Sequence, residues 1–417
     1  MFRDFFPRSL IQWLGPLLTC ALIALVLAIV VISSGVVNLA ASVPHPQGWA
    51  DLLHAAFKRS VAFHADSKGV PPDLDSASMV QKGAAYYATA CAHCHGAPGV
   101  GQNPVALMMR PRPQYLPAVV KEFTPAELAY IVRHGVKYSA MPAWPAQSRP
   151  DEAWPLVAFL RAMPELSHAQ FQALAYGNDK APEDSAIPVF KAPARLATYA
   201  LHKPDQPSSD EYLYAEPVFG FEAVPPGGNL LETCARCHGA DGRGRVGGRF
   251  PNLTIQTPTY LYDSLTSFAR GTRKSAYMQT IATELSAEQM AALARHFGNA
   301  TAAPAPQAPF NAALRDEGAR IAAYGIASQK VGGCTNCHGI TKAIGKAIPR
   351  LEGQSFGYIV DQMRAFRAGG RGTTRGINPM HTIAHSLNDH QIDAIAAYYA
   401  TTPPNAKAVP TARAVAQ

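Results

Sequence analysis

Cys91-Ala92-His93-Cys94-His95 is the first of three copies of one five-residue pattern in this chain. The other two copies are Cys234-Ala235-Arg236-Cys237-His238 and Cys334-Thr335-Asn336-Cys337-His338. In C-x-x-C-H, the two thiols can bond covalently to the vinyl groups of a haem, and the adjacent histidine can reach its iron. The pattern therefore predicts three covalently bound haem c groups, with His95, His238 and His338 as proximal ligands of the iron.

The cysteine count excludes a disulfide framework. The chain has 7 cysteines, of which six lie in the three motifs and the seventh, Cys20, lies in an apolar stretch. Zinc and a thioredoxin-like redox pair are the alternatives for any C-x-x-C. Zinc would need a second pair of ligands nearby, and a redox pair of that type would need a surrounding βαβ pattern. The sequence shows neither, so haem is the favoured interpretation.

An apolar run near the N-terminus predicts a transmembrane helix. No Asp, Glu, Lys or Arg occurs between Arg8 and Asp51, and residues 11–32 are almost wholly apolar, long enough to span a bilayer. A cleaved signal peptide is the alternative, with Ala40-Ala41-Ser42 as a small-residue cleavage site. In both cases the rest of the chain is exported. Because Arg3 and Arg8 outweigh Asp4, we expect a cytoplasmic N-terminus and a globular part in the periplasm of a bacterium, held at the inner membrane.

The formal net charge of +8 favours docking onto an acidic partner or an anionic surface, or simply a solvated basic face. Nothing in the sequence resembles a nucleic-acid-binding motif. We therefore expect no nucleic acid among the partners, and the apolar N-terminal run predicts contact with the membrane.

The surroundings of the motifs repeat, and no period-two strand pattern occurs, so we expect an all-α fold. Capping signals at Thr124 and Ser286 predict helices after them, and a helix at about 151–163 should pack across the one that leads into Cys91. The expected order is an anchor or signal peptide at 1–45, a haem domain at 46–165, a Pro-rich linker at 166–228, a haem domain at 229–300, a short linker at 301–310, a haem domain at 311–402 and a disordered tail at 403–417.

The sixth ligand of each iron decides its chemistry, since methionine or histidine closes the iron for electron transfer whereas an open position can bind small molecules. Met141, Met278 and Met380 are the candidates. Each lies about 40 to 46 residues after its motif histidine, in a loop expected before the last helix of its repeat. Core filling is the alternative role for a methionine. His134 in the first unit, and His381 and His385 in the third, are competing ligands.

Other residues are candidates for orienting the haem. The free ring nitrogen of each proximal histidine needs a carbonyl acceptor, and Pro251, Pro349 and either Pro111 or Pro113 stand at suitable spacings. A further set could bind haem propionates, because guanidinium and phenol groups suit carboxylates; it comprises Arg273, Tyr358, Arg364 and Arg367.

These residues resemble class I cytochrome c domains over about residues 76–163, 229–298 and 311–400. The last two resemble the paired domains of the dihaem cytochrome c4 family, through Pro349-Arg350-Leu351-Glu352-Gly353-Gln354, Met380-His381-Thr382-Ile383-Ala384 and a closing Ala-Ala-Tyr-Tyr. The first is similar to single-haem cytochromes with a Gly-Met-Pro-Ala-aromatic loop, here with Ala140 in place of Gly.

The resemblance implies single-electron transfer between periplasmic or membrane oxidoreductases, without bond chemistry in the chain itself. Trihaem, membrane-tethered cytochromes of this plan serve as cytochrome subunits of periplasmic aldehyde and alcohol dehydrogenases and pass electrons to quinone or an oxidase. The Asn-Ile-Thr-Pro-Asp loop of the alcohol dehydrogenase subunits is absent here. Donation to a terminal oxidase stays open, and a multihaem peroxidase, an enzyme with one open iron, is the alternative of another class.

Overall fold

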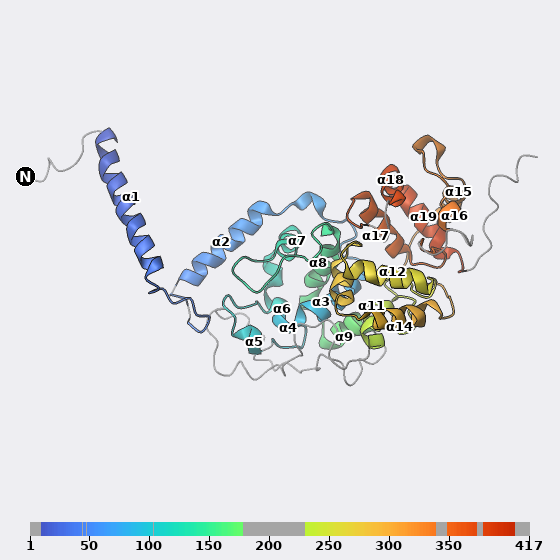
Figure 1. The fold of residues 1–417 in the computed structure, drawn as a ribbon, viewed down its shortest axis with the longest axis horizontal. Helices are drawn as coiled ribbons and strands as arrows, with labels where there is room; N and C mark the ends of the chain where they lie inside the picture. The colour runs from blue at the N-terminus through green and yellow to red at the C-terminus, as the bar shows by residue number, and fades with distance from the viewer. Residues whose placement is uncertain are drawn as a thin grey trace, which may run out of the picture. The chain divides into compact units, whose positions relative to one another are not determined.

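The computed structural model describes residues 10–43, 45, 46, 48–102, 104–177, 230–338, 348–372 and 378–404. Within these ranges every regular element is a helix (Figure 1), and β-pairing is limited to three isolated bridges. The all-α fold class is confirmed. By its contacts the chain divides into two parts, Met1–Ala50 and Asp51–Gln417.

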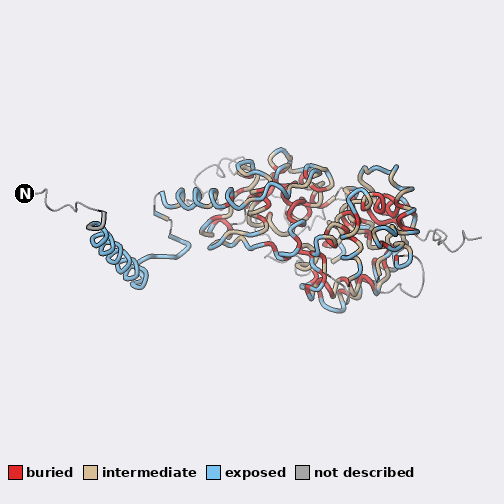
Figure 2. The backbone as a smooth tube through the Cα atoms, turned by 90° about the horizontal axis from the view of Figure 1, so that it is seen from above, coloured by how far each residue is buried: buried red, intermediate tan, exposed pale blue. Residues whose placement is uncertain are grey.

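Helix α1, Leu10–Ser33, forms the regular structure of the N-terminal part. Its Trp13–Ser33 portion, 21 residues, has the length and apolar composition needed to cross a membrane. Its described side chains are exposed, as the pale blue tube in Figure 2 shows. An exposed apolar helix of this length suits either a bilayer or a signal sequence.

The first unit, residues 51–177, contains most of α2 and the helices that precede and follow the first motif. They are α2 (Trp49–His64), α3 (Ala77–Ala90), α4 (Ala92–His95), α5 (Pro104–Leu107), α6 (Leu116–Val119), α7 (Pro125–His134), α8 (Ala153–Ala162) and α9 (His168–Tyr176). The predicted start of α7 is confirmed: Thr124 and Glu127 form a capping box, with Pro125 as the first helical residue.

The second unit, residues 230–300, and the third, residues 311–404, repeat this plan with fewer helices. The second contains α11 (Leu230–His238), α12 (Pro258–Ala269), α13 (Ala276–Ala282) and α14 (Ala287–Gly298). The third contains α15 (Arg315–Tyr324), α16 (Thr335–His338), α17 (Phe356–Arg367), α18 (Pro379–Ser386) and α19 (Asp389–Thr401). Ser286 caps α14 in a capping box with Gln289, as predicted.

The last helix packs across the lead-in helix in both the first and the third units, at a glycine. A Cβ atom placed on Gly83 of α3 would lie 1.9 Å from the carbonyl oxygen of Pro155 in α8. The same construction on Gly318 of α15 gives 1.9 Å to the carbonyl oxygen of Ala394 in α19. Since glycine has no Cβ, the two backbones can approach directly. The predicted packing of the helix at about 151–163 across the helix that leads into Cys91 is thus observed, as α8 on α3.

Helix α9 falls in the range expected as a linker, which is a difference from the sequence prediction. Ser167 and Gln170 form a capping box at its start, and Phe171 and Ala175 are fully buried in the core of the first unit. The first unit therefore extends to at least residue 176, because these apolar side chains complete its core. The remainder of the expected linker, 178–229, and most of the expected tail, 405–417, lie outside the described residues.

Each unit has a hydrophobic cluster, and that of the first also includes Ala276 and Tyr277 of the second; buried residues appear in red in Figure 2. One charged group joins the three units. Arg249 of the second unit binds Asp73 of the first unit and, at 2.6 Å, Asp361 of the third. Lys82 of the first unit also binds Asp361, at 3.2 Å. Partly buried ion pairs of this kind depend on close geometry, so they tie the units to one arrangement.

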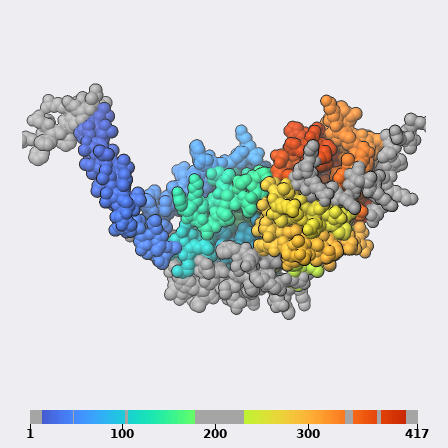
Figure 3. All heavy atoms as spheres, in the orientation of Figure 1, coloured from blue at the N-terminus to red at the C-terminus, as the bar shows by residue number. Residues whose placement is uncertain are grey.

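The expected linker at 301–310 packs against the third unit. Ala305 is buried, and its amide donates to the carbonyl of Gly353 at 2.8 Å. Asn252 of the second unit donates to the carbonyl of Ala303 at 2.8 Å. The linker is thus held between the two units, and Figure 3 shows atoms of the second unit (yellow) against those of the third (orange to red).

Candidate haem-binding sites

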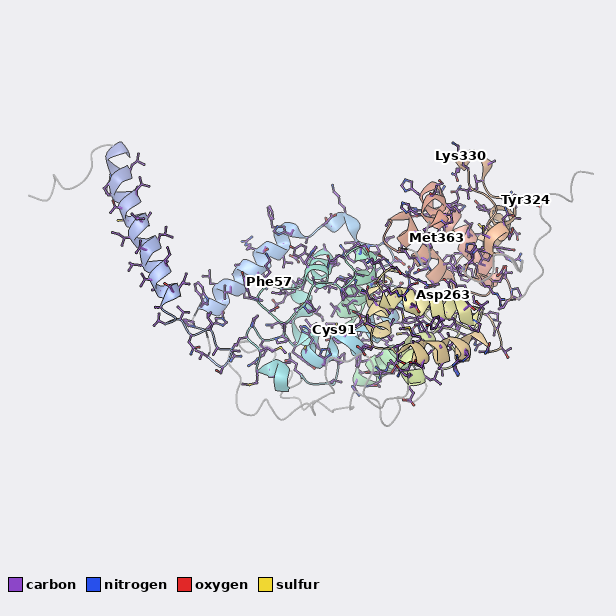
Figure 4. All side chains as sticks on the ribbon, in the orientation of Figure 1. Phe57, Cys91, Asp263, Tyr324, Lys330 and Met363 are labelled. Carbon is purple, nitrogen blue, oxygen red and sulfur yellow. The ribbon has the colours of Figure 1, made fainter. Side chains whose placement is uncertain are left out.

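A short helical segment presents the cysteines and histidine of each motif. Cys91, labelled in Figure 4, ends helix α3, and α4 then carries Cys94 and His95. The second motif, with Cys234, Cys237 and His238, forms the last turns of α11. In the third, Cys334 precedes α16, which carries Cys337 and His338. Residues three and four apart share one face of a helix, so two thiols and one imidazole converge as covalent haem attachment needs.

Each motif histidine is held through the same ring nitrogen by a backbone carbonyl. Nδ1 of His338 lies 2.9 Å from the carbonyl oxygen of Pro349, and Nδ1 of His238 lies 3.2 Å from the carbonyl oxygen of Pro251. Both acceptors were expected from the sequence. A carbonyl only accepts hydrogen bonds, so Nδ1 carries the proton and Nε2 keeps the lone pair that a metal needs.

In the first unit the acceptor differs from the expected Pro111 or Pro113. His95 Nδ1 lies 2.8 Å from the carbonyl oxygen of Gln114. The carbonyl of Pro113 instead accepts from the side chain of Gln102, at 2.8 Å. Spacing alone could not distinguish neighbouring carbonyls, because their directions depend on how the loop folds.

Burial keeps the three histidines in the neutral form. Desolvation lowers the pKa of His95, His238 and His338, which opposes protonation at neutral pH. Neutral imidazole is the form that binds metals. Hydrogen bonding and desolvation therefore both leave Nε2 available to bind a metal.

The methionine candidates lie in ordered segments with defined backbone contacts. The amide of Met141 is held by Ser139 Oγ at 3.1 Å. Met278 and Met380 lie in the first turns of α13 and α18, whose caps Ser275 and Asn378 bind the two methionine amides. The expected loop position holds for Met141, whereas Met278 and Met380 begin short helices of their own. All three side chains are only partly exposed.

The competing histidines are all exposed. His381 also binds the carbonyl oxygen of Phe366 through Nδ1, at 2.6 Å. The ring of His134 is tilted by 39° against that of Tyr130, with centroids 4.5 Å apart, and His385 is exposed, with its ring centroid 6.4 Å from that of His381. Met380, by contrast, packs against the core of the third unit. The preference for methionine over histidine therefore rests on burial alone, because a carbonyl on Nδ1 leaves Nε2 of His381 as available to a metal as that of the motif histidines.

Arginine and tyrosine side chains gather where the second and third units meet. Arg273 is buried and donates to Ser264 at 2.9 Å and to Tyr358 of the third unit at 3.1 Å. Arg371 is also buried, and its carbonyl oxygen accepts from the amide of Lys274 at 2.8 Å. Its Nε has no hydrogen-bond partner among the described residues. Burial and the charge of Arg273 lower the pKa of Arg371 to about 10.

These buried guanidinium groups fit the carboxylates of haem propionates. Neither Arg273 nor Arg371 forms an ion pair with a carboxylate in the described part of the chain, although unpaired buried charges are costly. Trp144 Nε1 is a further buried donor without a partner among the described residues.

Of the residues expected from the sequence, Arg273 and Tyr358 form a hydrogen bond with each other, whereas Arg367 pairs with Asp389 at the surface. Sequence reasoning missed Arg371, although the chain places it just before the Met380 segment.

An all-helical chain whose repeated motifs present two thiols and a tautomer-fixed histidine is a c-type cytochrome. Family models agree: residues 78–160 match the description "Cytochrome C oxidase, cbb3-type, subunit III", and residues 226–300 match "Cytochrome c".

Relatives define the family more closely. A thiosulfate dehydrogenase electron acceptor of Thiomonas intermedia (strain K12) is 36% identical over 43% of this chain and 82% of its own length. A cytochrome c4 of Pseudomonas aeruginosa is 30% identical over 40% of this chain and 82% of its own. A solved cytochrome c4 from Acidithiobacillus ferrooxidans matches 40% of this chain and 98% of its own, at 29% identity and a TM-score of 0.36. The chain belongs to the c-type cytochrome family that includes cytochrome c4 and the thiosulfate dehydrogenase electron acceptors, and it transfers electrons through covalently bound haem c.

Proposed function

We propose that the chain carries three haem c groups, one on each motif, with His/Met ligation of every iron. The ligand pairs are His95 and Met141, His238 and Met278, and His338 and Met380. One observation carries the proposal: all three motif histidines hold their Nδ1 proton on a backbone carbonyl, so all three present Nε2. Sites built alike support three haems of one kind.

Haem content tests the number of haems. The pyridine haemochrome spectrum of the purified chain should give three haems per polypeptide, and replacing both cysteines of one motif by alanine should give two. Two haems in the unaltered protein would contradict the proposal. Magnetic circular dichroism tests the ligands, since each His/Met haem should contribute a thioether-to-iron band. A high-spin haem would favour a peroxidase-type enzyme instead.

We also propose that α1 remains as a membrane anchor, with the haem units in the periplasm. The support is an apolar helix of 21 residues without charge, preceded by Arg3 and Arg8. The protein should resist extraction from membranes by carbonate and keep its N-terminal residues in intact-mass measurements. A matched chain with residues 1–42 replaced by a cleavable signal should be released. A mature N-terminus near Ser42 in the natural protein would show cleavage.

For the partner, we propose a dehydrogenase whose electrons enter this cytochrome, as part of a membrane complex or a respiratory chain. Two relatives are named thiosulfate dehydrogenase electron acceptors, and both are matched over most of their length. Purification from membranes in mild detergent should retain a dehydrogenase, and addition of its substrate should reduce the haems within the preparation. On this proposal the chain alone catalyses no bond chemistry.

A terminal oxidase is the second candidate partner. The first unit matches the model described as subunit III of a cbb3-type oxidase. Oxidation of the pre-reduced chain by oxygen, in membranes that lack any added dehydrogenase substrate, would favour the oxidase. Reduction by dehydrogenase without such oxidation would favour transfer to quinone or to another carrier.

A further inference from the structure

A six-residue segment occurs twice beside the histidine-binding carbonyls. Pro251-Asn252-Leu253-Thr254-Ile255-Gln256 follows the second motif, and Pro349-Arg350-Leu351-Glu352-Gly353-Gln354 follows the third. Each begins with the proline whose carbonyl binds the proximal histidine, and each ends with a buried glutamine, of which Gln256 is 6% and Gln354 2% exposed. A buried amide side chain needs partners for both its donor and its acceptor groups.

Each glutamine side chain binds one residue of the other unit through both its oxygen and its nitrogen, and Gln354 Oε1 also accepts from the amide of Ser355 in its own unit, at 2.9 Å. Gln354 Oε1 accepts from the amide of Asn252 at 2.7 Å, and Gln354 Nε2 donates to the carbonyl of Asn252 at 3.1 Å. Gln256 does the same to Arg350, accepting from its amide at 3.0 Å and donating to its carbonyl at 2.8 Å. The contact is reciprocal, as in a two-fold symmetric interface made from one repeated sequence.

The bound amides belong to the peptide groups that hold the histidines. The peptide joining Pro251 to Asn252 accepts from His238 through its oxygen and donates to Gln354 through its nitrogen. The peptide joining Pro349 to Arg350 accepts from His338 and donates to Gln256 in the same way. Each proximal histidine is thus connected, through one peptide, to a glutamine of the neighbouring unit.

Such a connection has a defined electronic effect. Donation by a peptide N–H polarises the peptide and makes its carbonyl a stronger acceptor, because hydrogen bonds in a chain reinforce one another. A stronger acceptor on Nδ1–H makes the imidazole a better electron donor to iron. Greater donation stabilises ferric over ferrous iron and lowers the reduction potential.

We propose that Gln256 and Gln354 are reciprocal positioning residues, each of which lowers the potential of the haem in the other unit. The inference rests on the proposed His/Met haems of the second and third units. The first unit supplies an internal comparison, because it has no such glutamine. There the carbonyl of Gln114 accepts from His95, and the residue five positions later, where the other two units have glutamine, is Val119.

Gln354→Met tests the proposal, since methionine keeps the volume but removes the acceptor. The potential of the haem on His238 should rise, by up to about tenfold in the ratio of reduced to oxidised haem, or about 59 mV for one electron. The haem on His338 should move less, and that on His95 should not move. Gln256→Met should raise the potential of the haem on His338 instead. Potentiometric titration followed by the hyperfine-shifted NMR signals of each haem separates the three values.

Two further variants make the test specific. Gln354→Glu keeps an acceptor oxygen, so the potential of the haem on His238 should not rise. Gln307→Met is the matched control, because Gln307 binds the carbonyl of Gln354 and the amide of Phe356 in the same interface without touching a histidine-binding peptide. Two results would overturn the proposal. One is a rise of the haem potential in Gln307→Met as large as that in Gln354→Met, and the other is a rise, in Gln354→Met or Gln256→Met, confined to the haem of the substituted unit. Normal haem content and His/Met bands with no shift would refute this inference alone and leave the proposed function standing.

Discussion

The phenol ring of Tyr277 lies edge-on to the indole ring of Trp144, with centroids 5.8 Å apart and an interplanar angle of 87°. Tyr277 belongs to the second unit and directly precedes Met278, while Trp144 belongs to the first and stands three residues after Met141. Tyr86 also contacts Tyr277, at 4.4 Å between centroids. An aromatic contact between units thus joins the two proposed methionine segments.

We expect Tyr277→Ala to destabilise the protein by about 3–5 kcal/mol, because it removes a large aromatic group from a packed interface. Tyr277→Phe should cost only about 1 kcal/mol, since it removes one hydrogen bond to the carbonyl of Glu152. Urea unfolding followed by circular dichroism measures both. Equal losses in the two variants would show that the hydroxyl, and not ring packing, dominates.

Gly135→Ala should displace the Met141 segment. Gly135 has a φ of 63°, and an added Cβ would lie 2.6 Å from the carbonyl oxygen of Met141. We expect weakening or loss of one thioether-to-iron band in magnetic circular dichroism, with three haems retained. Gly69→Ala is the control in the same unit, because its nearest neighbour would be 3.9 Å away. An unchanged band in Gly135→Ala would argue against Met141 as a ligand.

Arg371→Gln should lower the potential of a haem at the contact of the second and third units. A cation near a propionate favours the ferrous form, so its removal favours the ferric form by about tenfold or less, or about 59 mV. Arg367→Gln is the control, because Arg367 is already paired with Asp389. Potentiometric titration checks the difference, and matching shifts in both variants would remove Arg371 as a propionate partner.

The ion pairs of Asp361 predict a pH dependence of stability. Burial opposes ionisation, but Arg249 and Lys82 outweigh it and hold the pKa of Asp361 below its usual value. The stabilisation is therefore present above the unfolded-state pKa, about 3.9 for aspartate, and is lost as pH falls through the lower folded value.

Asp361→Asn should remove that acid-dependent portion, so its stability should change less steeply than that of the natural protein below about pH 4. Urea unfolding across an acidic pH series measures the slopes. Asp75→Asn is the control, because Asp75 makes an exposed pair with Arg161 and should leave the slope unchanged. Parallel curves for the natural protein and Asp361→Asn would contradict the expectation.

Local signals predicted much of the fold. Thr124 and Ser286 marked helix starts correctly because a capping box depends on residues three apart. Helix α9 was not predicted, because a helix this short is stabilised mainly by tertiary packing, here of Phe171 on the core of the first unit. The acceptor of His95 was misassigned for a similar reason, because loop geometry decides which carbonyl faces the ring.

The sequence by itself determined the chemistry that is covalent or local: two thiols and a histidine within five residues, three times, in an all-helical chain. Those features are encoded by neighbours along the chain, which share one helical turn. Only the tertiary structure decided what distant residues do together. Arg249 meets acids from two other units, Arg371 lies buried beside Arg273, and Gln256 and Gln354 exchange hydrogen bonds across an interface. Such pairings depend on how whole units pack, and sequence spacing carries no record of that geometry.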